Sequence, residues 1–193
     1  MMVEMMDPKP EDTICDPACG TSGFLVAAGE YLKEKYKDEI FYNREKKDHY
    51  NNHMFYGYDM DRTMLRIGAM NMMLHGVEAP NITWVDSLSE DNTHREEDSL
   101  IMANPPFNLS DWGADKLKDD VRWQYGMPPA GNANFAWLQH MIYHLAPNGK
   151  IGMVLANGAL SSQSGGEGEI RKNIVNADLV ECIVAMPTQP FYT

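Results

Sequence analysis

The tetrapeptide Asn104-Pro105-Pro106-Phe107 follows directly on the apolar run at residues 100–103. Neither proline has an N–H group, and the pyrrolidine ring fixes φ of each proline near about −65°. A residue that precedes a proline is kept out of the α-helical region, so the restriction extends back to Asn104. The apolar run is therefore expected to be a buried strand that ends in a stiff, extended tip.

This tip carries an amide side chain, carbonyl oxygens and an aromatic ring at the carboxyl end of its strand. In open α/β sheets, ligands bind at the carboxyl ends of the strands. Fixed hydrogen-bond acceptors beside an aromatic face suit a planar group that bears an –NH2. The alternative interpretation is that the two prolines only end the strand, and these four residues alone do not decide between the two.

Composition indicates one soluble globular domain. The chain has 193 residues, of which 44% are hydrophobic and 23% are charged. No apolar run has the length of a membrane span, and Glu4 and Asp7 interrupt the methionine-rich start, so neither a membrane segment nor a signal peptide is expected. Cys15, Cys19 and Cys182 form neither a CxxC pair nor a disulfide framework, which favours a reducing cytoplasm.

The net charge argues against nucleic-acid binding by this chain alone. There are 16 Lys and Arg against 28 Asp and Glu, a balance of −12. Neutralisation of phosphates by basic side chains supplies most non-specific affinity for DNA. If the substrate is DNA, another segment or subunit must therefore bring the positive charge.

A small-residue turn follows the first expected strand, at residues 13–15. It reads Asp16-Pro17-Ala18-Cys19-Gly20-Thr21-Ser22-Gly23-Phe24, and a helical pattern covers residues 25–37. Small residues let a ligand approach the backbone closely, and a helix N-terminus presents free N–H groups. A tight strand-to-helix connection is the alternative, and the motif is not GxGxxG, so a dinucleotide pyrophosphate is disfavoured.

Acidic residues follow the next two expected strands, at residues 54–58 and 81–85. Asp59 is placed to accept hydrogen bonds from the hydroxyls of a ribose, or to cap the helix that starts at Arg62. We assign the ribose to Asp59 and the cap to Asp61. Asp86 is expected either to lie near the edge of a base or to start a turn.

The helix from Arg62 to Gly76 is expected to turn Leu65, Met72 and Met73 inward, with its methionines as core filler. Residues 38–52 are polar and predict a solvated connection.

The second half of the chain predicts helices at 133–145 and 169–176 and strands at 151–155 and 179–185. Residues 108–131 form a long connection, and residues 158–168 are rich in Gly and Ser. Both segments have few evident core-facing positions and are expected to be poorly ordered without DNA. His140 and His144 lack a third ligand, so no metal site is expected. Six strands alternating with helices predict a mostly parallel α/β sheet.

Two motifs together resemble a known family. Asp16 to Phe24 and Asn104 to Phe107 are similar to the two signature motifs of S-adenosylmethionine-dependent methyltransferases that act on the amine of adenine in DNA. Three further segments resemble the modification (M) subunit of type I restriction–modification systems: Ala69-Met70-Asn71-Met72-Met73-Leu74-His75-Gly76, Gly131-Asn132-Ala133-Asn134-Phe135-Ala136-Trp137 and Gly166-Glu167-Gly168-Glu169-Ile170-Arg171-Lys172. The resemblance implies a Rossmann-like, doubly wound class I methyltransferase fold, with residues 1–193 as one catalytic domain.

The resemblance also implies roles for individual residues. S-adenosylmethionine would bind along the turn, with Asp59 on the ribose and Asp86 and Leu88 at the adenine edge. Asn104 and the Pro105 carbonyl would accept the two N–H bonds of the target amine, and Phe107 would stack on a base flipped out of the duplex. The implied cofactor site comprises Asp16, Ala18, Cys19, Gly20, Thr21, Ser22, Gly23, Phe24, Asp59, Asp86 and Leu88, and the implied catalytic tip Asn104, Pro105, Pro106 and Phe107.

Chains of this family are longer. The resemblance implies an N-terminal helical domain, a Phe-Tyr-Thr-Pro-type segment that closes over the cofactor, a final antiparallel hairpin strand and a C-terminal region, so this chain is expected to be a catalytic core truncated at both ends. The implied partners are DNA, a specificity subunit and a restriction subunit, and a specificity subunit that reads the sequence makes an acidic catalytic core tolerable. Two alternatives stay open: a protein-glutamine methyltransferase, in which Tyr is usual at the position of Phe107, and a non-catalytic cofactor-binding fragment.

Overall fold

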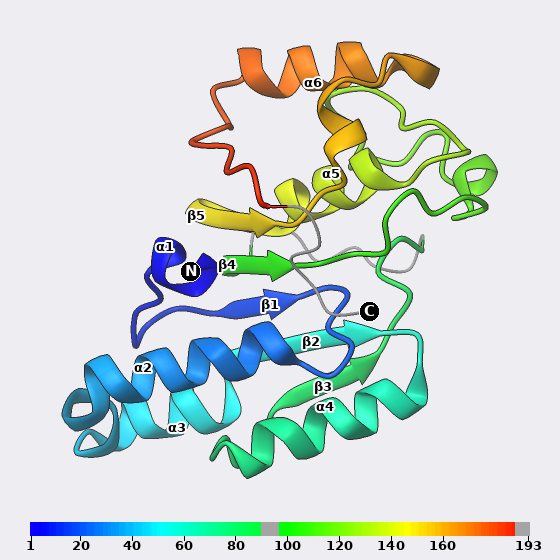
Figure 1. The fold of residues 1–193 in the computed structure, drawn as a ribbon. Coiled ribbons are helices and arrows are strands. Elements are labelled where there is room, and N and C mark those ends of the chain that lie inside the picture. The colour runs from blue at the N-terminus through cyan, green and yellow to red at the C-terminus, as the bar shows by residue number, and fades with distance from the viewer. Residues whose placement is uncertain (90–96, 188–193) are drawn as a thin grey trace.

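The structure is a computed structural model that describes residues 1–89 and 97–187. Its centre is a five-stranded, all-parallel sheet with the order β3-β2-β1-β4-β5 (Figure 1). The strands are β1 (Ile14–Asp16), β2 (Phe55–Asp59), β3 (Asn81–Trp84), β4 (Asp98–Ala103) and β5 (Leu145–Met153). The predicted parallel α/β architecture is confirmed.

Side chains that alternate along the strands divide the core between the two faces of the sheet. Ile14, Phe55 and Met102 point into a cluster with the helices α1 (Met2–Met6), α2 (Gly23–Phe41), α3 (Arg44–Asn52) and α4 (Arg62–Leu74). Their neighbours Cys15 and Ile101 face α5 (Asn134–His144) on the other side. Helix α6 (Glu167–Asn176) packs outside α5, which gives a layered molecule (Figure 1). Short 3-10 helices lie at Ala114–Lys116, Asn157–Leu160 and Ser164–Gly166.

The connection predicted at residues 38–52 is wrong, because most of it is helical. Helix α2 continues to Phe41, and α3 starts after Asn43, whose side chain accepts hydrogen bonds from two backbone N–H groups of the first turn. Tyr50 is fully buried, with its ring 5.5 Å from that of Phe41 and 5.3 Å from that of Phe55. A single buried aromatic residue among charged ones carries no clear helical period, so the sequence pattern missed this helix.

Helix α4 buries a narrower stripe than predicted. Leu65 and Met72 are buried, but Met73 is 58% exposed and Met70 is 62% exposed, so the inward orientation of Met73 and the role of the methionines as core filler are wrong for these positions. The helix approaches the turn after β1 through Gly68, which has no side chain to prevent the contact. The outward methionines are left at the surface.

The sixth predicted strand is not formed. Residues 179–187 have no regular secondary structure, and apolar side chains in this segment are exposed, Ile183 by 65%. A strand needs a neighbour for its backbone N–H and C=O groups. In the described part of the chain the sheet ends at β5, and residues 179–187 pair with no strand. No helix among the described residues is both long enough and apolar enough to cross a membrane.

Candidate active site

The predicted site residues lie at one edge of the sheet. Asp16 ends β1, Asp59 ends β2, and Asn104 follows the last residue of β4. All strands are parallel, so these ends meet at the same edge, on the right in Figure 1. Strands β1 and β4 are neighbours, with Cys15 opposite Ile101, which sets the proline tip beside the turn after β1. The chain reverses its winding direction between these two strands, and such a switch point is where open α/β sheets bind ligands.

Asp59 braces the turn after β1. Its Oδ2 accepts a hydrogen bond from the backbone N–H of Gly20 at 2.9 Å, and its Oδ1 accepts one from Asp61 N–H at 2.8 Å. The cap of α4 is Asp61, whose Oδ1 accepts from the N–H groups of Thr63 and Met64 at 2.7 and 3.2 Å. The assignment of the cap to Asp61 is therefore confirmed, and Asp59 is left at the strand end.

The turn itself leaves room for a ligand. Gly20 has a φ of +50°, a conformation that favours glycine, and a Cβ placed on Gly20 or Gly23 would meet nothing within 4 Å. Helix α2 starts at Gly23, so its first N–H groups open on the same space. An open cradle of this kind fits the close backbone approach that the sequence predicts.

Helix α4 holds the other side of the turn. A Cβ on Gly68 would lie 2.5 Å from Ser22 Oγ and 3.0 Å from Gly20 O, so only glycine permits this approach. One turn later, Asn71 Nδ2 donates a hydrogen bond to Thr21 O at 3.0 Å. No role was predicted for Gly68, and Asn71 was named only within the resembling segment at residues 69–76. The available signal was a glycine inside a helical pattern.

Asp16 is buried beneath the turn. Its Oδ1 accepts a hydrogen bond from Ala18 N–H at 3.1 Å. Burial, with a smaller effect of the nearby Asp59 charge, raises the pKa of Asp16 to about 7. Burial also raises the pKa of the Cys19 thiol to about 12, so this cysteine stays protonated and unreactive at neutral pH.

The segment after β3 joins the same edge. Asp86 Oδ1 accepts from Leu88 N–H at 3.1 Å, which closes a turn, and Ser87 Oγ donates to Pro17 O at 2.6 Å. Leu88 is 2% exposed and Asp86 is half-buried. Asp86 therefore starts a turn, as one interpretation predicted, and lies in a segment tied to the turn after β1.

The proline tip is anchored by one of its four residues. Pro105 is buried, whereas Asn104, Pro106 and Phe107 are exposed, Phe107 by 43%. The Asn104 amide and the Phe107 ring thus stand at the surface on a fixed support. Side chains in this arrangement can contact a ligand without a rearrangement of the core.

A pair of asparagines fixes the residue after the tip. Asn108 has a φ of +52°, and its N–H donates to Asn134 Oδ1 at 3.0 Å. In return, Asn134 Nδ2 donates to Asn108 Oδ1 at 3.0 Å, and Ala133 N–H donates to Leu109 O at 2.9 Å. Asn134 is 2% exposed, in the first turn of α5. In the sequence Asn134 stands out only as part of the resembling segment at residues 131–137, and this contact was not predicted.

The long connection at 108–131 is packed. The expectation of few core-facing positions is wrong, because Trp112 and Trp123 are buried edge-to-face at 5.7 Å and form a second core with Leu88 and Trp137. Each indole N–H donates to a carbonyl within the connection, Trp112 to Pro129 O at 3.1 Å and Trp123 to Leu117 O at 2.6 Å. Buried aromatics at irregular spacing show no period in a sequence, which explains the miss.

The expectation of few core-facing positions is confirmed for residues 158–168, most of which are exposed. Ala159 and Glu167 are buried. Arg171 on α6 donates hydrogen bonds to Ala159 O at 3.0 Å and Ser162 O at 2.6 Å. A single arginine thus holds two carbonyls of a segment that reads as flexible.

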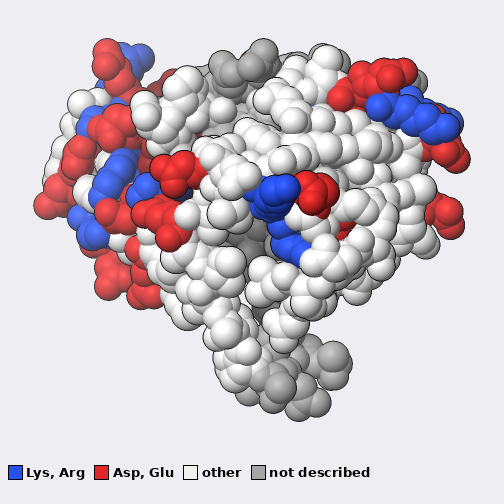
Figure 2. All heavy atoms as spheres, turned by 90° about the horizontal axis from the view of Figure 1, so that it is seen from above, with Lys and Arg blue, Asp and Glu red and all other residues white. Residues whose placement is uncertain are grey.

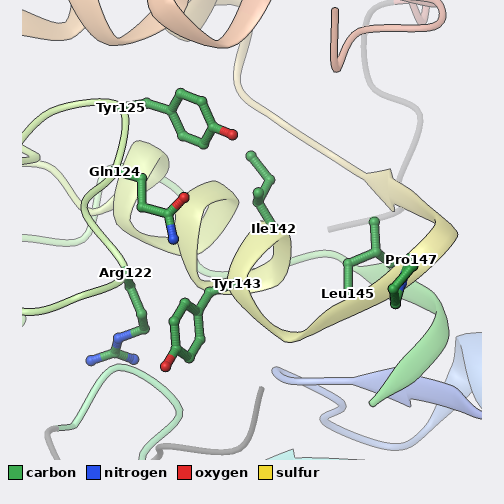
Figure 3. A pocket seen from close by; sticks show the side chains of 7 residues that line it. All are labelled: Arg122, Gln124, Tyr125, Ile142, Tyr143, Leu145 and Pro147. Carbon is green, nitrogen blue, oxygen red and sulfur yellow. The ribbon is translucent and has the colours of Figure 1, made fainter. Parts of the chain in front are cut away.

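The predicted site is an open edge, distinct from a cavity of about 200 Å³ beside α5 (Figure 3). None of the predicted site residues lines that cavity, whose walls are Arg122, Gln124, Tyr125, Ile142, Tyr143, Leu145 and Pro147. Within the described residues, no three His, Cys, Asp or Glu are arranged to hold a metal ion. His140 instead contacts Arg122, at 3.1 Å.

A parallel sheet with an open glycine turn after β1, an acid after β2 and an Asn-Pro-Pro-Phe tip after β4 defines a class I methyltransferase fold of the amino-methyltransferase type. The chain belongs to the N-6 DNA Methylase family, whose sequence profile matches residues 1–193.

Relatives carry more specific names. The type I restriction enzyme HindI methylase subunit of Haemophilus influenzae is 45% identical over 99% of this chain and 41% of its own length. The MjaIX methylase subunit of Methanocaldococcus jannaschii is 43% identical over 100% of this chain and 33% of its own length. The chain thus spans well under half of these relatives.

Solved structures of type I methyltransferase subunits have a similar fold. The crystal structure of the type I restriction enzyme EcoKI M protein aligns with a TM-score of 0.71 at 26% identity, over 89% of this chain and 35% of that protein. A type I restriction-modification methyltransferase subunit from Streptococcus thermophilus gives the same TM-score and identity, over 91% of this chain and 36% of its own.

Proposed function

We propose that this chain is the catalytic core of the modification subunit of a type I restriction–modification system, and that it methylates the exocyclic amine of adenine in DNA with S-adenosylmethionine. The observation that carries the proposal is the exposed Asn104 on a buried strand end, next to the open turn of Gly20 and Gly23. In this arrangement the proposed acceptors for the amine lie beside the proposed cradle for the cofactor. The names of the relatives support DNA as the substrate and a type I system as the setting.

The residues at the edge suit this cofactor. Gly20 and Gly23, which have open space around them, would accommodate its methionine part, and Asp59 would accept from the ribose hydroxyls. Asp86 and Leu88 would lie at the adenine edge. The carboxylates at this edge favour a cationic ligand and disfavour a phosphate. When bound, the cofactor supplies an electrophilic methyl group on a positively charged sulfur.

The chain's own residues would act mainly by orientation. The Asn104 amide oxygen and the Pro105 carbonyl each accept one N–H bond of the target amine. Two fixed acceptors favour a pyramidal nitrogen, which turns its lone pair away from the ring and toward the methyl donor. A strong base is unnecessary because the proton leaves only after the nitrogen has become cationic, so the contribution is preorganisation.

Phe107 would hold the target base outside the duplex. Flipping a base costs a few kcal/mol, and stacking on an aromatic face recovers about 1–3 kcal/mol of this cost. The ring of Phe107 is 43% exposed, next to the proposed acceptors in the chain. A stacked base would be presented to the tip by its amine edge.

The negative net charge of the chain favours DNA binding through a second subunit. The chain carries −12, and Figure 2 shows charged side chains of both signs crowded at the end where the strands begin, with a broad uncharged surface beside them. We propose that a specificity subunit supplies the basic DNA-binding surface, that a restriction subunit completes the system, and that the assembly works in the cytoplasm. The segments that the longer relatives add would complete the cofactor cover and the subunit contacts.

The test is methyl transfer by the full-length polypeptide, assembled with its specificity subunit. Labelled S-adenosylmethionine is presented with three acceptors: an unmethylated duplex that contains the recognition site, the same duplex premethylated at adenine N6, and a release-factor protein. The proposal predicts label in the unmethylated duplex only. Label in the protein would instead support a protein-glutamine methyltransferase, and label in no acceptor would support a non-catalytic fragment.

A further inference from the structure

Arg122 is a buried cation that no part of the proposed chemistry uses. It is 2% exposed and belongs to the connection that follows the proline tip. Its guanidinium group points away from the cavity beside α5, although Arg122 lines that cavity (Figure 3). Burying a charge costs free energy unless the charge is paired, so the partners of the Arg122 guanidinium indicate its structural role.

Three of those contacts go to the segment after β3. Nη1 donates to Ser87 O at 3.0 Å, and Nη2 donates to Leu88 O and Ser89 O, each at 3.0 Å. One side chain therefore binds three consecutive carbonyls. The planar guanidinium can do this because its donors form a rigid fork.

The remaining contacts orient the fork. Nε and Nη2 donate to the two oxygens of Asp120 at 2.9 and 2.8 Å, and Nη1 lies 3.1 Å from His140 Nδ1. Burial, with the charges of His144 and Arg122, holds the pKa of His140 well below its usual range, so its ring is neutral and its Nδ1 can accept. Burial acts to raise the pKa of Asp120, but the hydrogen bonds from Arg122 outweigh it and lower that pKa.

The clamped segment touches the turn after β1. Ser87 Oγ donates to Pro17 O at 2.6 Å, and Ala18 packs on the same aromatic cluster as Leu88. A chain of direct contacts thus runs from the connection after the proline tip, through Arg122 and Ser87, to the cofactor turn. Asp86 directly precedes the three residues whose carbonyls Arg122 binds.

We propose that Arg122 is a positioning residue for adenine recognition: from the segment that follows the proline tip, it fixes the carbonyls of residues 87–89 and thereby the position of the neighbouring Asp86. The inference rests on the proposed function, because it takes Asp86 and Leu88 as the adenine edge of the cofactor site. It makes the cofactor's adenine pocket depend on the packing of residues 108–131. A displacement of residues 108–131 would first reduce the preference for ligands that carry the adenine amine over ligands that lack it.

The experiment compares two ligands by calorimetry on the full-length polypeptide. S-adenosylhomocysteine carries the adenine amine, and S-inosylhomocysteine has a carbonyl oxygen in its place. The unmodified protein is expected to bind the first at least about tenfold more tightly, because the second would set a carbonyl oxygen against the Asp86 carboxylate, two acceptors with no proton to share. Arg122→Lys keeps the charge but loses the fork, and should reduce that ratio to below about threefold.

Two variants are matched controls. Arg171→Lys removes a guanidinium whose Nη1 binds two carbonyls of another segment, and should preserve the ratio even if it lowers the melting temperature to the same extent. Asp59→Ala should weaken both ligands equally and leave the ratio unchanged. If Arg122→Lys does not fold, Asp120→Asn, which loosens the same fork, should lower the ratio in the same direction.

The outcomes separate the two proposals. An undiminished ratio in a folded Arg122→Lys or Asp120→Asn protein would overturn the role of Arg122 and leave the proposed function standing. An unmodified protein that binds neither ligand would overturn the proposed cofactor site, and the role of Arg122 with it.

Discussion

Asn134 and Asn108 exchange two hydrogen bonds, each 3.0 Å long, between an amide side chain at the start of α5 and the residue that follows Phe107. Asn108 needs this support, because its φ of +52° lies in the left-handed region. The pair ties the proline tip to a helix in the core. The Asn108–Asn134 pair thus helps to hold the exposed proline tip in position.

The first prediction concerns this contact. Asn134→Ala should lower the single-turnover methylation rate by about 10–100-fold, because a misplacement of about 1 Å can cost that much. The affinity for S-adenosylmethionine should stay within twofold. Asn132→Ala is the control. Asn132 donates to Asn108 Oδ1 over 3.3 Å and accepts from Asn134 N–H at 3.0 Å, but it does not hold the N–H of Asn108, so the rate should fall much less. Equal rates in the Asn134 variant and the unmodified protein would show that the pair does not position the tip.

The second prediction concerns the two neighbouring acids after β2. Asp59→Ala should weaken binding of S-adenosylhomocysteine by at least about tenfold, because it removes the proposed ribose acceptor and the hydrogen bond that holds Gly20 N–H. Asp61→Ala removes only the cap of α4, which costs about 1 kcal/mol of stability and should leave affinity unchanged. Calorimetry gives the affinity and thermal unfolding gives the stability. Identical affinities of the Asp59 variant and the unmodified protein would remove Asp59 from the site.

The third prediction concerns pH. The pKa of Asp16 is about 7 in the folded protein, above its ordinary value of 3.8, so the folded state binds the extra proton between these values. Its contribution to stability is complete below about pH 4 and is lost as the pH rises toward 7. Asp16→Asn keeps the oxygen that accepts from Ala18 N–H and should flatten this part of the profile.

Urea unfolding at pH 5 and pH 8 measures the effect. The loss of unfolding free energy between the two pH values should be smaller in Asp16→Asn than in the unmodified protein. Asp98, whose pKa burial also raises to about 7, contributes in the same direction and remains in both proteins. An identical loss in the two proteins would mean that Asp16 is ionised throughout.

The fourth prediction concerns the long connection. Without DNA, amide exchange should be slow around Trp112 and Trp123 and fast in the exposed stretch just after the tip, at residues 109–111, because only the former belong to a buried cluster. Hydrogen exchange followed by mass spectrometry resolves the two stretches. Fast exchange throughout would contradict the packed connection and favour the disorder that the sequence suggested.

Much of the architecture could be predicted because its signals are local. Buried strands ending at Asp16, Asp59 and Asn104 follow from short apolar runs and the polar residues after them. The turn at Gly20 and the cap at Asp61 follow from residue chemistry within a few positions. The carboxyl ends of parallel strands then meet by topology, so the strand-end residues could be placed together before any coordinates.

The parts that could not be predicted depend on distant partners. Arg122 bonds to carbonyls 33–35 residues away, and Asn134 to a residue 26 positions away, and neither pairing has a sequence period. The apolar run at residues 179–185 led to a wrong prediction for the same reason. Such a run is typical of a strand, but among the described residues no strand pairs with it.

The central claim is that the tip acts on the target amine. The direct measurement is single-turnover methylation of a duplex that contains the recognition site, by the full-length polypeptide assembled with its specificity subunit. It compares Asn104→Ala with the unmodified protein, and cofactor affinity is measured in parallel. Phe107→Tyr, which keeps the stacking face, serves as the mild variant.

Asn104→Ala should reduce the methylation rate by at least about 10²–10³-fold, the usual loss for one preorganised group, with nearly unchanged affinity for S-adenosylmethionine. Phe107→Tyr should stay close to the unmodified rate. A rate in Asn104→Ala equal to that of the unmodified protein would contradict the account, since Asn104 would then only end a strand.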